Sequence, residues 1–158
     1  MMKTNIGISD KGRRGSAEIL NRLLADEYVL YTKTRKDHWN VTGPDFSELH
    51  KFFESQYEEL DDIIDKVAER ARAVGGVSLG SLKEFLQHTR LRESSGGSPA
   101  AKKMIADLLA DHESVIRSLR EDLVTCEERY GDMGTSDFLT GLMEQHEKMA
   151  WMLRAYLE

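Results

Sequence analysis

The sequence predicts an all-α protein built as a four-helix bundle. Four long segments carry apolar residues at the spacing of one helix face. Two short links and one long link, residues 75–99, separate these segments. The composition agrees, since 40% of the residues are hydrophobic, 32% are charged and only two are proline. At 158 residues, the chain is expected to form one domain with its own core.

The composition also predicts a location for the protein. No apolar run is long enough to cross a membrane, and the start lacks the pattern of a signal peptide. Cys126, the single cysteine, cannot form a disulfide within the chain, which favours a reducing compartment. We therefore expect a cytoplasmic protein in which Cys126 is a small buried apolar residue.

The first fifteen residues are predicted to form a flexible basic arm ahead of a bundle at residues 16–158. They show no helical period and hold three glycines. Residues 1–16 carry a net charge of +3 from one acidic residue, Asp10, and four basic residues: Lys3, Lys11, Arg13 and Arg14. Because the whole chain has a net charge of −6, the remaining residues carry −9. A basic tail on an acidic body is a pattern of interaction tails.

The first two helices are expected to meet at a tight turn. The first should run from Ser16, a good N-cap residue, to about Val41. Gly43-Pro44 interrupts it, and Asp45 caps the second helix. That helix should end at Gly75-Gly76, and its roughly 29 residues would make a rod of about 43 Å.

The second half of the chain is expected to contain a short helix and two long ones. The short helix, Leu82–His88, lies inside the long connection. Ser98, followed by proline, is predicted to cap the third long helix, which should close at Gly131. The fourth should open at Thr135 or Ser136.

The connections predict the topology. Short links force the first and second helices, and the third and fourth, to be antiparallel neighbours. The long link can span the full length of the bundle. One long crossover in a four-helix bundle is the ferritin-like arrangement. The alternative is a simple up-down bundle with a long loop.

The segment from His38 to Glu69 carries the residues most suited to binding a metal. Imidazole and carboxylate groups together suit Fe, Mn or Zn. On the second helix, His50, Glu54, Asp65 and Glu69 share one broad face. His50 and Asp65 are nevertheless about 22 Å apart along the axis, whereas a metal ligand lies about 2 Å from its ion. One copy of the helix cannot close a site.

Two antiparallel copies of the helix can close it. If a twofold axis lies near Glu59 and Leu60, the His50 end of one chain meets the Asp65 end of the other, and the contact forms two equivalent sites. His38, close by across the turn, could supply a second imidazole. The alternative is that these carboxylates form an ordinary solvated face and the histidines are structural.

The same residues resemble those of a known family. The string HWNVTGPDFSELH, the later Asp65–Arg70 segment, Gly75-Gly76 and Ser81–Leu86 are similar to the Dps family of mini-ferritins. The resemblance covers roughly Ile19 to Leu157, including the short helix in the connection. It implies a ferritin-like bundle assembled as a hollow homododecamer, with two iron sites at each twofold interface.

The resemblance also implies the chemistry and its residues. Fe²⁺ would be oxidised, by hydrogen peroxide in preference to dioxygen, and ferric mineral stored inside. Trp39 could intercept a stray oxidising equivalent, or simply pack at an interface. Where this chain has Glu54 the family generally has Asp, which leaves the second iron position in question. One chain would supply the first three ligands and its mate the last two: His38, His50, Glu54, Asp65 and Glu69.

The family further suggests a pore and a DNA-binding arm. Asp132 and Asp137 match acidic positions at a threefold entry pore, where carboxylates would attract Fe²⁺; Asp137 could instead favour a helix N-terminus. Lys3, Lys11, Arg13 and Arg14 could bind DNA without sequence preference, weakly for one arm but multivalently for twelve. The arginines could equally dock onto the acidic shell.

Other functions remain open at this point. A non-specific DNA-binding protein that compacts the nucleoid would need little iron chemistry, and a purely structural bundle would need none. None of the five histidines follows a glutamate by three positions, so a di-iron centre inside one chain lacks its usual motif. His112 and His146 lie on apolar faces, where a hydrogen-bonded core histidine is the simpler interpretation. His88 is expected at the surface or at an interface.

Overall fold

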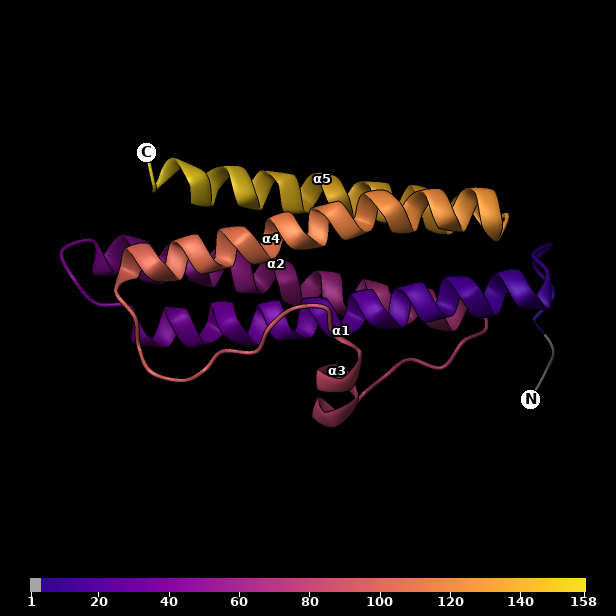
Figure 1. The fold of residues 1–158 in the computed structure, drawn as a ribbon, viewed down its shortest axis with the longest axis horizontal. Helices are drawn as coiled ribbons and strands as arrows, with labels where there is room; N and C mark the ends of the chain where they lie inside the picture. The colour runs from indigo at the N-terminus through magenta and orange to yellow at the C-terminus, as the bar shows by residue number, and fades with distance from the viewer. Residues whose placement is uncertain (1–3) are drawn as a thin grey trace.

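The computed structural model describes residues 4–158, and this part of the chain is helical without β-strands. The long helices are α1 (Asp10–Asn40), α2 (Phe46–Ala73), α4 (Ala101–Val124) and α5 (Met133–Ala155). A short helix, α3 (Leu82–His88), lies in the long connection, and a π-helical turn, η1 (Thr125–Arg129), follows α4 directly. Figure 1 shows the four long helices side by side in one elongated bundle.

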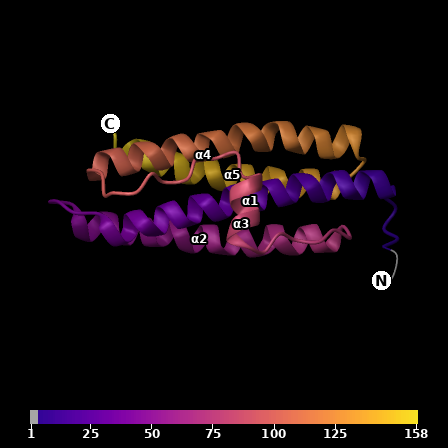
Figure 2. The same ribbon diagram turned by 60° about the horizontal axis from the view of Figure 1, so that its bottom comes forward.

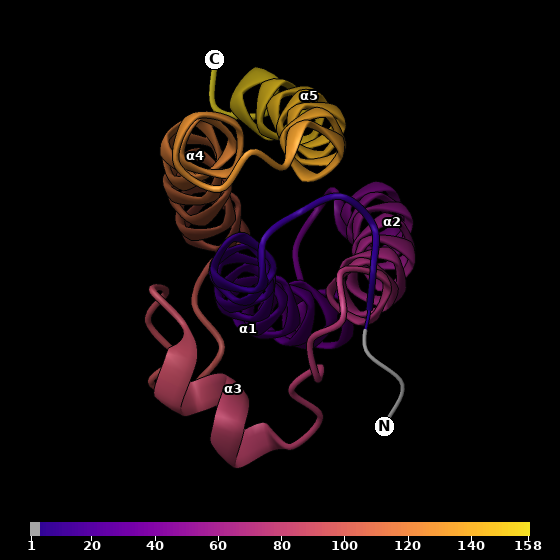
Figure 3. The ribbon, with the colours of Figure 1, turned by 90° about the vertical axis from the view of Figure 1, so that its right-hand side faces the viewer.

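The long crossover of the predicted ferritin-like topology is confirmed. α1 and α2 are antiparallel, as are α4 and α5, and the connection carries the chain back along the bundle so that α2 and α4 run in the same direction (Figures 1 and 2). An up-down bundle would have made α2 and α4 antiparallel. Seen from the end, α3 lies outside the four helices, next to α1 (Figure 3).

The core lies between the four long helices. Its apolar side chains come from the predicted faces, and each fully buried leucine or phenylalanine contributes about 1.5–3 kcal/mol to folding. The largest completely buried ones include Leu20, Leu23, Leu24, Leu30, Phe53, Leu60, Leu108, Leu119, Leu139 and Met149.

The short helix is anchored at both ends. The helix begins at Leu82, as predicted, and Ser81 and Glu84 form a reciprocal capping box there. Phe85 is buried and stacks on the Tyr28 ring of α1, with ring centroids 4.4 Å apart. Beyond the helix, the buried Asp26 carboxylate accepts hydrogen bonds from Thr89 and Arg90.

The predicted start of the first helix is wrong. α1 begins at Asp10, and Ser9, rather than Ser16, caps it by accepting a hydrogen bond from the Gly12 amide at 3.0 Å. Gly12 and Gly15 lie inside the helix. A Cβ on Gly15 would sit 2.2 Å from the Tyr130 ring, so this glycine permits close packing and does not mark a flexible arm.

Two other helix starts also differ from prediction. α4 begins at Ala101, and the Ser98 hydroxyl donates to the Asn40 carbonyl of α1 and does not cap the helix. α5 begins at Met133, and its cap is Asp132, which accepts from the Thr135 amide at 2.9 Å.

The π-helical turn was not predicted. Cys126 is completely buried within it, as expected, and burial raises the pKa of its thiol to about 12. A thiol that stays protonated is a poor nucleophile, which agrees with a packing role for Cys126.

Candidate metal centre

His38 and His50 meet at the end of the bundle where α1 turns into α2. Gly43, at a φ of 117°, makes the left-handed step that this short turn requires. The two imidazole rings stack with centroids 3.8 Å apart and planes 19° from parallel. The turn has thus placed the two histidines together, as the sequence predicted.

The backbone determines which nitrogen of each ring is free. His38 Nδ1 lies 2.7 Å from the His50 carbonyl oxygen, and His50 Nδ1 lies 2.9 Å from the His38 carbonyl oxygen. A carbonyl oxygen only accepts, so each Nδ1 must donate a proton. In each neutral ring, Nε2 then carries the lone pair that a metal ligand needs. The reciprocal pair of hydrogen bonds orients both imidazoles for binding a cation.

Aromatic side chains surround this pair. The Tyr57 ring packs edge-on against His38 with centroids 5.2 Å apart, and the Phe46 ring lies 5.2 Å from His50. The Arg35 guanidinium lies over the Tyr57 and Trp39 rings, at 4.8 Å and 5.6 Å from their centroids. His38 is buried by these contacts, whereas 65% of Trp39 is exposed.

Glu54 lies one helical turn beyond His50 on α2. It is half-buried, and the Tyr57 hydroxyl donates to its Oε1 at 3.4 Å. Burial and the neighbouring Glu54 carboxylate raise the pKa of the Tyr57 hydroxyl, so this hydroxyl stays a proton donor. Glu54 therefore has one long hydrogen bond, from the same Tyr57 whose ring packs against His38.

Asp65 and Glu69 are exposed and lie further along α2. Within one subunit, no three histidine, cysteine or acidic side chains of residues 4–158 lie close enough together to hold a metal ion. The five predicted ligands are divided into two groups: His38, His50 and Glu54 at one end of α2, and Asp65 and Glu69 nearer the other.

Within one subunit, Asp132 is a buried helix cap, and its pore role stays a prediction. Its side chain is only 1% exposed and is engaged with Thr135 and Arg70. Although burial raises it, hydrogen bonds from Thr135 and the charge of Arg70 together hold the pKa of Asp132 below its usual value. These contacts already engage both carboxylate oxygens of Asp132. Asp137 is exposed on α5, and its pore role stays a prediction.

The basic residues of the predicted arm have different environments. Lys3 lies outside the described residues. Arg13 is docked, with an ion pair to Asp10 at 2.7 Å and a hydrogen bond to the Val74 carbonyl. Lys11 and Arg14 are exposed on the first turns of α1. The DNA-binding role of Lys11, Arg13 and Arg14 stays a prediction.

The two core histidines have partners, as predicted. His146 contacts both His112 and Glu27, a completely buried glutamate that the sequence analysis did not single out. Its position on the apolar face of α1, next to Leu23, Leu24 and Leu30, was the available signal. His88 is exposed at the end of α3.

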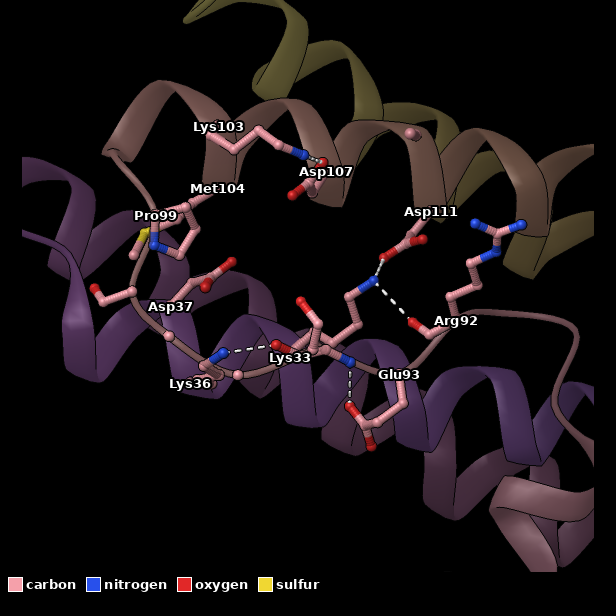
Figure 4. A pocket seen from close by; sticks show the side chains of 16 residues that line it. Lys33, Lys36, Asp37, Arg92, Glu93, Pro99, Lys103, Met104, Asp107 and Asp111 are labelled. Carbon is pink, nitrogen blue, oxygen red and sulfur yellow. Dashed lines mark hydrogen bonds and ion pairs between the residues drawn. The ribbon is translucent and has the colours of Figure 1, made fainter.

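A polar cavity of about 670 Å³ lies between α1, α4 and residues 92–99 of the connection (Figure 4). Lys33 is bonded to Asp111, and the Lys36 ammonium bonds Ser94. Burial, together with Asp107 and Asp111 and against the pull of the nearby lysines, raises the pKa of Asp37 to about 6. Four basic and four acidic side chains line the cavity, and neither His38 nor His50 is among its lining residues.

The comparisons with known proteins agree with this architecture. The family model described as the ferritin-like domain matches residues 17–158. The "DNA protection during starvation protein 2" of Bacillus anthracis is 39% identical over 140 residues, which cover 89% of this chain and 94% of that protein. The chain belongs to the Dps family of ferritin-like proteins. The predicted family and fold are both confirmed.

Two further relatives extend the comparison with the Dps family. A crystal structure of a Dps protein from Vibrio cholerae O1, described as a member of a broad superfamily of ferritin-like diiron-carboxylate proteins, superposes with a TM-score of 0.91. It is 31% identical, over 100% of this chain and 99% of that one. An uncharacterized low temperature-induced protein of Nostoc is 48% identical over all 158 residues and 88% of its own length. In the described part of this Dps chain, no helix is long and apolar enough to span a membrane.

Proposed function

We propose that this Dps protein oxidises Fe²⁺ at sites shared between two subunits and stores the ferric product inside a hollow homododecamer. The observation that carries the proposal is the split donor set. Two imidazoles with free Nε2 atoms lie at one end of α2, and two exposed carboxylates lie nearer its other end. A twofold contact between α2 helices brings the two groups together and forms two sites per interface.

The two subunits would contribute different ligands to each proposed site. His38, His50 and Glu54 of one subunit, and Asp65 and Glu69 of its mate, would bind two Fe²⁺ ions as substrates. Each Fe²⁺ gives one electron to the same hydrogen peroxide molecule, which takes up two protons as its O–O bond breaks and leaves as two waters. Supplying both electrons together avoids release of a hydroxyl radical. Trp39, which follows His38 in the chain and is exposed, would supply an electron to a stray oxidising equivalent. Dioxygen is the alternative oxidant.

Subunit mixing tests whether the sites are shared. One variant lacks the imidazole half through His50→Ala and Glu54→Ala, and the other lacks the carboxylate half through Asp65→Ala and Glu69→Ala. Each alone should oxidise Fe²⁺ no faster than buffer. Co-expressed assemblies with random mixing should recover about a quarter of the wild-type sites, because half of the interfaces are mixed and one of their two sites is intact.

The readout of this experiment is iron retained by the assembly. Anaerobic apoprotein is loaded with excess Fe²⁺, peroxide is added, and mass and iron are measured across the size-exclusion peak. Ferric ions eluting with a particle of about twelve subunits support storage in the proposed assembly. Full activity of either variant alone, or no recovery in the mixture, would exclude the shared site.

DNA protection is the second candidate function. It is favoured by the exposed Lys11 and Arg14 near the start of α1 and by the name of the Bacillus anthracis relative. The net charge of −6 opposes it. In this case the protein would associate with the nucleoid in the cytoplasm and shield DNA from oxidative damage.

Salt dependence separates direct DNA binding from a general effect of charge. Replacing Lys11 and Arg14 with alanine should reduce the slope of log Kd against log salt by up to about 0.9 for each phosphate that is no longer neutralised. Replacing Lys83 and Lys102, which are equally exposed and change the charge identically, serves as the control. Equal effects of the two double variants would argue against DNA binding through α1.

A further inference from the structure

Three ionisable side chains form a hydrogen-bonded row in the middle of the bundle. Glu27 of α1, His146 of α5 and His112 of α4 have no exposed surface at all. Glu27 Oε1 lies 2.8 Å from His146 Nε2, and the Nδ1 atoms of His146 and His112 lie 2.9 Å apart. The row therefore connects α1 to both helices of the opposite pair.

The contact between the two imidazoles tolerates one proton only. A hydrogen bond between two ring nitrogens needs an N–H on one side and a lone pair on the other. If both rings became imidazolium ions, two N–H groups would face each other at the observed 2.9 Å separation, and one positive charge would lack a partner. The contact must then break, because these completely buried side chains would leave that charge without solvent or a counter-ion to stabilise it.

The two outermost atoms of the row, on Glu27 and His112, lower the stability that the row gives to the fold. Glu27 Oε2 and His112 Nε2 are buried and have no hydrogen-bond partner among the described residues. Unpartnered polar atoms in a core destabilise a fold, and apolar side chains of similar size would often do better. These three residues are therefore expected to do more than contribute to the stability of the bundle.

We propose that Glu27, His146 and His112 form an acid-sensitive lock on the bundle. The lock holds α1 against the α4–α5 pair while one proton lies between the two imidazoles. It opens when a second proton enters. This device involves none of the proposed iron ligands and does not depend on the proposed function.

The surroundings of His112 determine the direction of the pH effect. Burial first, and His146 second, hold the pKa of His112 well below its usual value. Two ionisable groups lie beyond the His112 ring: His146 on α5, which contacts it directly, and Glu27 on α1, which contacts His146. The buried Gln56 of α2 is uncharged and donates to the Met149 carbonyl of α5. His112 is thus neutral when folded. Its contribution to stability is complete above the unfolded pKa of about 6.5 and is lost as the pH falls below that value.

Unfolding of the apo assembly by urea, measured from pH 8 to pH 5 at one protein concentration, tests the lock. Below about pH 6.5, the folding equilibrium constant of the wild type should fall as the pH is lowered. This fall should be steeper than that of His112→Gln by up to about tenfold per pH unit. His88→Gln removes an exposed histidine and should follow the wild type. Parallel pH dependences of wild type and His112→Gln would overturn the proposal.

Hydrogen exchange on the wild type covers the case in which His112→Gln does not fold. After correction for intrinsic rates, lowering the pH from 7 to 5 should speed exchange in the segments of α1, α4 and α5 that carry the row. The end of α2 far from the row should change less. Uniform acceleration along the chain, or none, would contradict a local lock.

Discussion

The two histidine pairs of this chain have opposite arrangements. His38 and His50 stack at the end of the bundle, and each uses Nδ1 on a backbone carbonyl, which leaves Nε2 free. His112 and His146 lie in the core, and each uses Nδ1 on the other ring. The imidazoles at the end of the bundle are therefore oriented to bind a cation, whereas those in the core bind each other. The difference lies in what each ring meets. The turn from α1 into α2 brings the rings of His38 and His50 against each other's backbone carbonyls, whereas the rings of His112 and His146 meet each other between α4 and α5.

Removing the buried carboxylate should produce the largest effect on stability. Glu27→Ala leaves His146 Nε2 without its partner in the core, which should lower the free energy of unfolding by about 3–5 kcal/mol. Urea unfolding at pH 7 measures it.

Glu113→Ala is the matched control for that experiment. Its ion pair with Arg154 lies on the surface, so its loss should cost at most about 1 kcal/mol. Similar losses in the two variants would mean that the core row is not a coupled unit.

Disrupting the His38–His50 pair should lower the rate of Fe²⁺ oxidation and leave the stability of the fold largely unchanged. His50→Ala removes one free Nε2, so the initial rate of Fe²⁺ oxidation should fall by at least about tenfold. Loss of a side chain that only orients a metal ligand already lowers affinity or activity by about tenfold or more. Stopped-flow absorbance of the ferric product measures the rate. His88→Ala, which removes an exposed histidine on α3, should keep the wild-type rate. A stable His50→Ala assembly with full activity would remove the distinction between the two pairs.

The smallest effect is expected from the hydroxyl beside the end pair. Tyr57→Phe keeps the ring against His38 and removes only the long 3.4 Å hydrogen bond to Glu54. Stability should change by no more than about 1 kcal/mol, and the oxidation rate by less than in His50→Ala. Circular-dichroism melting and the same stopped-flow assay test both. A loss of activity as large as that of His50→Ala would show that the hydroxyl, and not the ring alone, orients Glu54.

The helix positions show where prediction from sequence succeeded and where it did not. The sequence predicts the short helix from Leu82 to about His88, and the structure confirms both bounds; a local capping box defines its start. The start of α1 was placed at Ser16 because three nearby glycines indicated disorder. Two of those glycines are in fact required by Tyr130, which lies more than a hundred positions away in sequence. Such a long-range contact leaves no local pattern.

The candidate sites show the same contrast. The sequence by itself determined that the chain is an all-helical bundle and that one copy of α2 cannot close a metal site, because helical rise and periodicity follow from local geometry. Only the tertiary structure decided that Asp132 is a buried cap, that Nε2 is free on His38 and His50, and that Glu27 joins the core histidines. These properties depend on which groups meet after the helices have packed, and hydrogen-bond partners from different helices have no fixed spacing in the chain.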